Sequence, residues 1–237
     1  MSSFIIYAMG IAMDNHDLNA IIAGASGLVG DELLHQLLAN KRFKHIYALS
    51  RRDLPFHSSK LHQIIDPLLR INSWEHETPQ PQYGFICLGT TKRKAGSKSA
   101  LAAVDLDLVK DVATTMKNLG VKHIIVVSSL GASSHSPSHY LRCKGKMEQA
   151  ITKMGFEHCI FIRPGPLKGE RSEIRTDEQL LQHVFDVINP LVVGPLKHFS
   201  PIPAEYVARS MVKMALSCQK HQLEQKTIVS GHQLRTI

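Results

Sequence analysis

The stretch Gly24-Ala25-Ser26-Gly27-Leu28-Val29-Gly30 separates a short apolar run at residues 19–23 from a leucine-rich helical pattern at residues 31–40. With 15 glycines among 237 residues, this GxxGxxG spacing is expected by chance only about 0.06 times, so it carries information. Glycines in such a strand–helix turn let the backbone approach a diphosphate, whose charge the helix N-terminus stabilises. The turn therefore predicts dinucleotide binding, and a glycine-rich turn without a ligand is the alternative. The predicted cofactor contacts are Gly24, Ser26, Gly27, Leu28, Val29 and Gly30.

The rest of the chain alternates short apolar runs with helical patterns, which is typical of βαβ units and a parallel sheet. We expect strands at residues 19–23, 45–50, 61–66, 83–88, 122–129, 157–162 and 227–230. We expect helices at residues 31–40, 97–118, 138–154, 178–188 and 204–217. The predicted fold class is α/β with a doubly wound parallel sheet, the Rossmann fold. It forms one domain at residues 18–237, with a small C-terminal substrate-side segment from about residue 165. Residues 1–17 are an N-terminal extension that either packs on this domain or lies outside its core.

The composition is that of a globular protein, with 43% hydrophobic and 20% charged residues. No apolar run reaches the roughly 18–20 residues that a membrane span requires, so no span is expected. The net charge is +8, but the basic residues are scattered and only Lys92, Arg93 and Lys94 cluster, so we expect no nucleic-acid partner. The four cysteines form no CxxC pair and no metal-ligand spacing. This pattern predicts reduced thiols, no metal site and a cytoplasmic protein.

Two adjacent arginines, Arg51 and Arg52, follow the strand expected at residues 45–50. NAD-binding proteins place an acidic residue near this position on the ribose hydroxyls, whereas guanidinium groups suit the 2′-phosphate of NADP. We therefore expect NADP(H) as the preferred cofactor. NAD(H) remains an alternative because Asp53 is close enough in sequence to face a ribose. A solvated basic turn is the other alternative.

Tyr140 and Lys144 are four residues apart, which places them on one face of the helix expected at residues 138–154. A phenol has a pKa of about 10, so proton transfer near neutral pH needs a nearby cation such as this ammonium group. Ser128 and Ser129 stand at the end of the preceding strand, where a hydroxyl can hold a carbonyl oxygen. The YxxxK spacing alone is weak evidence, and an amphipathic helix with an exposed Tyr is the alternative. In this context we predict Tyr140 as general acid, with Lys144, Ser128 and Ser129 completing the catalytic group.

The chain resembles the atypical short-chain dehydrogenases/reductases, close to the oxidoreductase family of the HIV Tat-interactive protein. The resemblance runs from about residue 19 to residue 175. It rests on the glycine turn, Ser50-Arg51-Arg52, Leu88-Gly89-Thr90-Thr91, Lys94-Ala95-Gly96, Ser128-Ser129, Gly131-Ala132, Tyr140, Lys144-Gly145 and Arg163-Pro164-Gly165. After Pro166 the sequence departs from the family pattern, so the substrate-side region is the least transferable.

The resemblance implies a Rossmann protein that binds NADPH. It places Leu88 and Gly89 beside the adenosine or ribose and Lys144 on the nicotinamide ribose. Leu167 and Arg175 match positions near the nicotinamide end and the mouth of the site.

Two functions follow from these expectations. The first is an NADP-dependent oxidoreductase that reduces a small carbonyl compound by hydride transfer, with Tyr140 as proton donor. The alternative is an NADPH-binding redox sensor or regulatory scaffold with little or no turnover, because the fold alone does not imply catalysis. The expected partner is a small-molecule carbonyl substrate, and the chain is expected to be a monomer or a homodimer.

Overall fold

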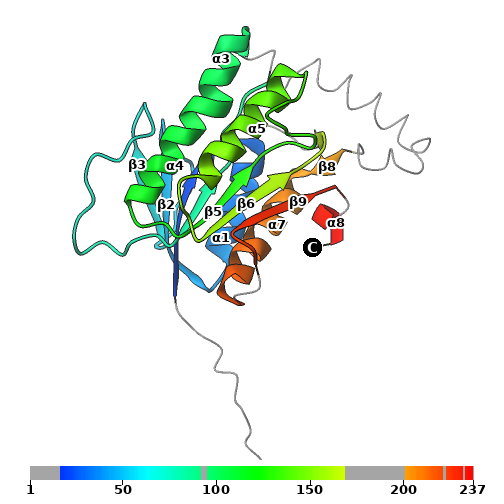
Figure 1. Cartoon of the computed structure of the whole chain (residues 1–237). Helices are drawn as coiled ribbons and strands as arrows, with labels where there is room; N and C mark the ends of the chain where they lie inside the picture. Colours follow the sequence, from blue (N-terminus) through cyan, green and yellow to red (C-terminus); the bar gives the residue numbers. More distant parts are fainter. Residues whose placement is uncertain (1–16, 92–94, 169–200, 221–222, 232, 237) are drawn as a thin grey trace, which may run out of the picture.

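A seven-stranded parallel sheet forms the centre of the molecule (Figure 1). The structure is a computed structural model, and it describes residues 17–91, 95–168, 201–220, 223–231 and 233–236. The strands lie in the order β3-β2-β1-β4-β5-β6-β9, and each neighbouring pair is parallel. Their bounds are β1 (Leu18–Ala23), β2 (Phe43–Ser50), β3 (Leu61–Ile65), β4 (Tyr83–Ile86), β5 (His123–Val127), β6 (His158–Arg163) and β9 (Lys226–Ser230).

Helices cover both faces of this sheet (Figure 1). The face with α1 and α7 buries one apolar cluster, and the face with α4 and α5 buries a second one. The helices are α1 (Leu28–Ala39), α3 (Lys98–Ala102), α4 (Val109–Asn118), α5 (His139–Thr152), α7 (Ala204–Ser217) and α8 (Gln233–Thr236). A π-helical segment, η1 (Ala103–Leu108), joins α3 to α4, and a 3₁₀ turn, η4 (Cys218–Lys220), follows α7.

The strand sequences explain this three-layer arrangement. All six residues of β1 are buried, because a central strand of a parallel sheet is covered on both sides. Successive side chains of β1 point to opposite faces, so Ala20 and Ile22 pack with the α1–α7 cluster, and Ile21 and Ala23 pack with the α4–α5 cluster. Such continuous apolar runs predict a doubly wound sheet, and that prediction is confirmed.

The strand order reverses between β1 and β4, the two strands at the centre of the sheet. In open α/β sheets, a crevice forms at such a reversal beyond the carboxyl ends of the strands, and ligands bind there. We call this side of the sheet the carboxyl edge, and the opposite side the amino edge.

The expected elements agree with the structure to within a few residues, with three differences. The helix expected at residues 97–118 contains the π-helical segment η1. A short parallel pair, β7 (Leu167–Lys168) with β8 (Ile202–Pro203), and helix α8 were not predicted. The helix expected at residues 178–188, Arg175 and the first sixteen residues lie outside the described residues. Among the helices that are described, none combines the length and apolarity needed to cross a membrane.

Candidate active site at the carboxyl edge

The glycine turn after β1 has no room for side chains at two of its glycines. Gly24 has φ +93, a conformation that suits glycine, and a Cβ there would lie 2.8 Å from the carbonyl of Cys87. A Cβ on Gly30 would lie only 2.0 Å from the carbonyl oxygen of Gly24. The first turn of α1 therefore packs directly on the end of β1. The two glycines make this close approach possible.

Helix α1 begins at Leu28 with Gly27 as its N-cap, and no side chain caps it. Gly27 donates its N–H to the carbonyl of Gly24, so the turn closes on itself. The N–H groups of the first helical turn have no partner within a helix, and they carry the positive end of its dipole. Because this helix N-terminus follows β1 at the carboxyl edge, the turn can offer a diphosphate both donors and positive potential.

Arg51 and Arg52 lie directly after β2, whose end pairs with the end of β1 through Leu49 and Ala23. Both arginines are exposed. Within the described residues, neither guanidinium group forms an ion pair or a hydrogen bond with another side chain. Both guanidinium groups are therefore available to an anion on the β2 side of the glycine turn.

A buried ion pair lies on the other side of the crevice. The Nζ of Lys144 on α5 is 2.8 Å from the Oδ1 of Asp105, and the two side chains are only 3% and 1% exposed. The Oδ2 of Asp105 accepts the N–H of Thr90, at 3.0 Å, just beyond β4. A Cβ on Gly89 would lie 3.2 Å from Asp105 Oδ1 and 3.6 Å from Lys144 Nζ. The ion pair therefore fastens α5 and the π-helical segment η1 to the loop that follows β4.

Tyr140 lies one helical turn before Lys144 and is half-buried. Its hydroxyl has no hydrogen-bond partner among the residues that the structure describes. Ser138 caps the helix just before it by accepting the N–H of Leu141. Tyr140 thus stands in the first turn of α5, at the carboxyl edge.

The two predicted serines have different surroundings. Ser128 is 4% exposed, and its hydroxyl donates a 2.5 Å hydrogen bond to the Oε1 of Glu148. Glu148 in turn accepts hydrogen bonds from Arg163 Nε at 2.9 Å and Nη2 at 2.5 Å. Ser129 is half-buried, and among the described residues its hydroxyl makes only a long 3.4 Å contact with the carbonyl of Leu130. Ser128 is thus occupied in a buried network, and the hydroxyl of Ser129 is the freer of the two.

The loop between β5 and α5 packs against Gly145 without any gap. A Cβ on Gly145 would lie 2.1 Å from the carbonyl carbon of Ser133. The N–H of Ser133 donates to the carbonyl of Leu141, and Gln149 donates to the hydroxyl of Ser134 at 2.8 Å. The glycine after Lys144 therefore lets the loop that begins at Ser129 lie directly on α5.

The remaining predicted cofactor residues are spread around the same edge. Leu88 packs against the α4–α5 cluster beyond β4, and Gly89 follows it beside the ion pair. Leu167 lies in β7 and packs against the other cluster. The prediction for Arg175 falls outside the described residues.

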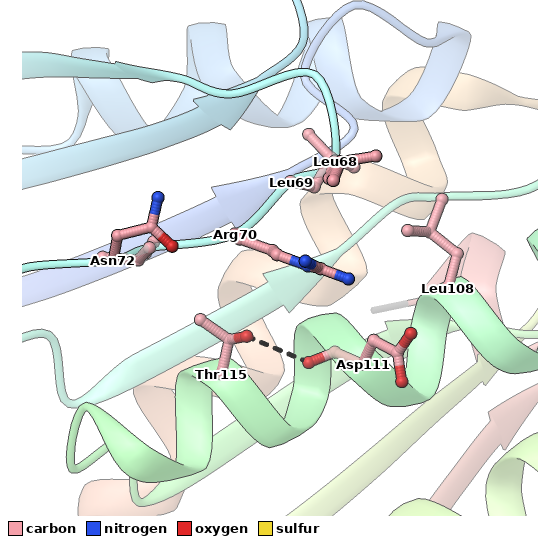
Figure 2. A pocket seen from close by; sticks show the side chains of 8 residues that line it. Leu68, Leu69, Arg70, Asn72, Leu108, Asp111 and Thr115 are labelled. Carbon is pink, nitrogen blue, oxygen red and sulfur yellow. Dashed lines mark hydrogen bonds between the residues drawn. The ribbon is translucent and has the colours of Figure 1, made fainter.

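A cavity of ≈ 470 Å³ lies between the loop after β3 and helix α4 (Figure 2). Leu68, Leu69 and Arg70 form its loop side. On the helix side, Thr115 donates its hydroxyl to the carbonyl of Asp111 (Figure 2). No predicted site residue in the described part of the chain lines this cavity, so we do not place the reaction there.

Cys87 follows β4, and its backbone carbonyl lies so close to Gly24 that a Cβ there would be 2.8 Å away. Burial raises the pKa of Cys87 to about 12, although the nearby Lys144 cation acts in the opposite direction. The thiolate is the reactive form of cysteine, so this thiol is unsuited to nucleophilic catalysis near neutral pH.

Sequence reasoning missed two acidic residues that organise the site, Asp105 and Glu148. A signal for both was present, because each occupies a position that helical spacing assigns to the core. Asp105 lies midway between the buried residues Leu101 and Val109, and Glu148 lies four residues after Lys144. An acidic residue at such a position requires a buried partner.

Comparisons with known proteins identify the family. The family model HIM1 matches residues 85–192. A protein named FMP52, mitochondrial, from Meyerozyma guilliermondii is 34% identical over 90% of this chain and 92% of its own length. HTATIP2 from Rattus norvegicus is 31% identical over 87% of this chain and 84% of its own. The structure of MoeE5 in complex with UDP-glucose and NAD has a TM-score of 0.63 at 13% identity, covering 92% of this chain and 80% of that one. This structural likeness confirms the predicted Rossmann-type fold.

The expectation of a cytoplasmic protein is wrong. Fungal relatives from several species, 33–36% identical to this chain, are named mitochondrial proteins. Reduced thiols do not distinguish the cytoplasm from the mitochondrion, so composition could not decide this point. Family membership, in contrast, is shown by identities above 30% over most of both chains. The chain belongs to the family of FMP52 and HTATIP2.

Proposed function

We propose that this protein is an NADP(H)-dependent reductase of a small carbonyl compound. One observation carries the proposal: the glycine turn, the two arginines and the Tyr140–Lys144 helix face the same edge of the sheet. The residues fit a nicotinamide dinucleotide, because Gly24 and Gly30 bring the uncapped N-terminus of α1 close to the end of β1, where its N–H groups can bind a diphosphate. The fold likeness to a protein solved with NAD supports the same assignment.

Each part of the site then has a chemical task. The first turn of α1 binds the diphosphate, and Arg51 and Arg52 bind the 2′-phosphate. Lys144 holds the ribose at the nicotinamide end, and the bound cofactor supplies the hydride. Ser129 holds the substrate oxygen by a hydrogen bond, and Tyr140 donates the proton that this oxygen takes up.

Replacing Tyr140 with phenylalanine tests the proton donor. We expect Tyr140→Phe to lower kcat by about 100-fold or more, because a positioned general acid contributes that much. Affinity for NADPH should stay within about twofold, since only the hydroxyl is lost. The measurement is NADPH oxidation in a screen of small aldehydes and ketones, with calorimetry for binding. Full turnover by the variant would show that another group donates the proton.

Replacing Arg51 and Arg52 with alanine tests the cofactor preference. Each charged hydrogen bond to phosphate contributes about 1.5–3 kcal/mol, so each substitution should weaken NADPH binding by about ten- to a hundredfold. Binding of NADH should change little. Arg70→Ala is the matched control, since Arg70 is another exposed arginine, after β3. An unchanged ratio of NADPH to NADH affinity in the double variant would contradict the 2′-phosphate role.

The alternative, an NADPH-binding sensor or scaffold with little turnover, is favoured by one observation. The carboxylate of Asp105 lies 2.8 Å from Lys144 Nζ, so it opposes the field that the ammonium group exerts on the phenol of Tyr140. Saturable NADPH binding without faster oxidation by any carbonyl compound in the screen would favour this alternative. We also propose that the protein works in mitochondria, as the names of its fungal relatives indicate for them.

A further inference from the structure

Three aromatic side chains form a row across the amino edge of the sheet. Each of them is the first residue of its strand: Tyr83 begins β4, His123 begins β5 and His158 begins β6. They are cross-strand neighbours, since Tyr83 pairs with His123 and His123 pairs with His158. Their ring centroids are 4.9 Å and 5.0 Å apart. Residues in register on parallel strands share one face, so all three side chains point toward the α1–α7 layer.

The two histidines turn the same kind of nitrogen toward each other. Nδ1 of His158 lies 2.9 Å from Nδ1 of His123, so one ring donates a hydrogen bond to the other. Both residues are half-buried. Because both Nδ1 atoms converge on one point between the strands, the pair provides two nitrogen ligands from two segments 35 residues apart.

A thiol completes the cluster from the helical layer. Cys218 is 2% exposed and opens the turn η4 at the end of α7. A ring nitrogen of each histidine and the Sγ of Cys218 all lie within 4.8 Å of one another. The thiol donates a 3.4 Å hydrogen bond to the carbonyl of Met214 in its own helix.

We propose that His123, His158 and Cys218 form a binding site for a zinc-class divalent metal ion at the amino edge of the sheet. Two imidazole nitrogens and one thiolate are ligands that zinc prefers, and magnesium and calcium prefer oxygen ligands. Three protein ligands leave a fourth position for a water molecule. This inference is independent of the proposed reductase function, because the cluster lies at the opposite edge of the sheet from the glycine turn.

The geometry requires only small movements. Zinc–nitrogen bonds of about 2.0–2.1 Å in tetrahedral geometry place two nitrogen ligands about 3.3 Å apart, so the histidine rings must separate by a few tenths of an ångström. A nitrogen and a sulfur ligand lie about 3.5 Å apart in the same geometry, and the three ligand atoms lie within 4.8 Å of one another, so the thiol must move closer by at most about 1.3 Å. Rotation of the Cys218 side chain supplies a movement of this size.

The surroundings of the thiol also bear on binding. Burial raises the pKa of Cys218 to about 12, so the free thiol keeps its proton near neutral pH. Burial also raises the pKa of Tyr83 to about 12, with Cys218 and Glu157 raising it further and Arg42 opposing. A metal ion must therefore displace the thiol proton, and binding should release it to the solvent. A bound ion would connect β5, β6 and the end of α7, which are far apart in the chain.

The test is a titration of the full chain, prepared free of metal, with Zn²⁺ and then with Co²⁺ as its spectroscopic substitute. We expect one equivalent of metal to bind and to raise the thermal unfolding midpoint, because the ion binds only the folded state. The Co²⁺ form should show a thiolate-to-cobalt charge-transfer band and the visible bands of a tetrahedral ion. Cys218→Ser should abolish the charge-transfer band, and His158→Gln should weaken Zn²⁺ binding at least about 100-fold, more than loss of an outer-shell partner does.

Matched controls separate this site from binding elsewhere. A second cross-strand histidine contact joins His62 Nε2 to His45 Nδ1 at 3.1 Å. His62→Gln should leave the affinity for the single tightly bound Zn²⁺ ion unchanged. Cys143→Ser should retain the charge-transfer band, since Cys143 lies on α5. NADPH affinity of Cys218→Ser should equal that of the wild type. The proposal would be overturned if the thiolate-to-cobalt charge-transfer band survived in Cys218→Ser. It would also be overturned if the wild-type chain bound several Zn²⁺ ions weakly, or none. If His158→Gln does not fold, the Co²⁺ spectrum of Cys218→Ser decides.

Discussion

Replacing Lys144 with methionine is expected to lower the free energy of unfolding by about 3–5 kcal/mol. The substitution removes one partner of a buried ion pair and leaves the carboxylate of Asp105, which is 1% exposed, without a counter-charge. The N–H of Thr90 remains as a hydrogen-bond donor to Asp105, but a neutral amide does not replace an ammonium group 2.8 Å away. Denaturant unfolding of the protein without cofactor measures the loss.

The double variant Asp105→Asn, Lys144→Met distinguishes an uncompensated charge from lost packing. Asparagine keeps an oxygen for the N–H of Thr90, and methionine keeps most of the apolar volume of lysine, so the pair should recover much of the lost stability. Lys146→Met is the matched control, since Lys146 is exposed on the same helix, and its effect should be within about 0.5 kcal/mol. A loss below about 1 kcal/mol for Lys144→Met alone would contradict the buried ion pair.

Replacing Gly30 with alanine is expected to disrupt both folding and cofactor binding. A Cβ there would lie 2.0 Å from the carbonyl oxygen of Gly24, which belongs to the backbone and cannot rotate away. The loss of stability should reach about 3 kcal/mol or more, at the upper end of overpacking effects. Because α1 must move away from β1, its N-terminal N–H groups leave the crevice, and NADPH affinity should fall by more than about 100-fold.

Gly27→Ala provides the graded comparison, since a Cβ there would lie 3.3 Å from the same oxygen. Gly27 has φ −92, which alanine adopts readily, so only a small adjustment is needed. Its effects on NADPH binding and on unfolding should both be much smaller than those of Gly30→Ala. Equal effects of the two substitutions would show that the close approach of α1 to β1 does not determine binding.

The fold was predictable because its signals are local. The apolar runs of β1 and β5 and the glycine turn between β1 and α1 each occupy a few consecutive residues, and their order implies a parallel sheet. The placement of Tyr140 and Lys144 one helical turn apart on α5 was predictable for the same reason, and their chemical roles stay a prediction.

The parts that could not be predicted depend on segments that meet only in the folded chain. Helical spacing indicates that Asp105 is buried, but it does not indicate that the partner is Lys144, which lies on the separate helix α5. The role of Ser128 depends on Glu148 and Arg163, which come from α5 and β6. His123, His158 and Cys218 show no metal-ligand spacing along the chain, because strand register and helix packing bring them together.

The contact between Gly145 and Ser133 constrains how the site responds to its ligands. At this contact backbone lies against backbone, with no layer of side chains that could slide or repack, so we expect the loop at Ser133 to move together with α5. We therefore expect the helix that carries Tyr140 and the loop that carries Ser129 to shift together when a ligand binds or leaves.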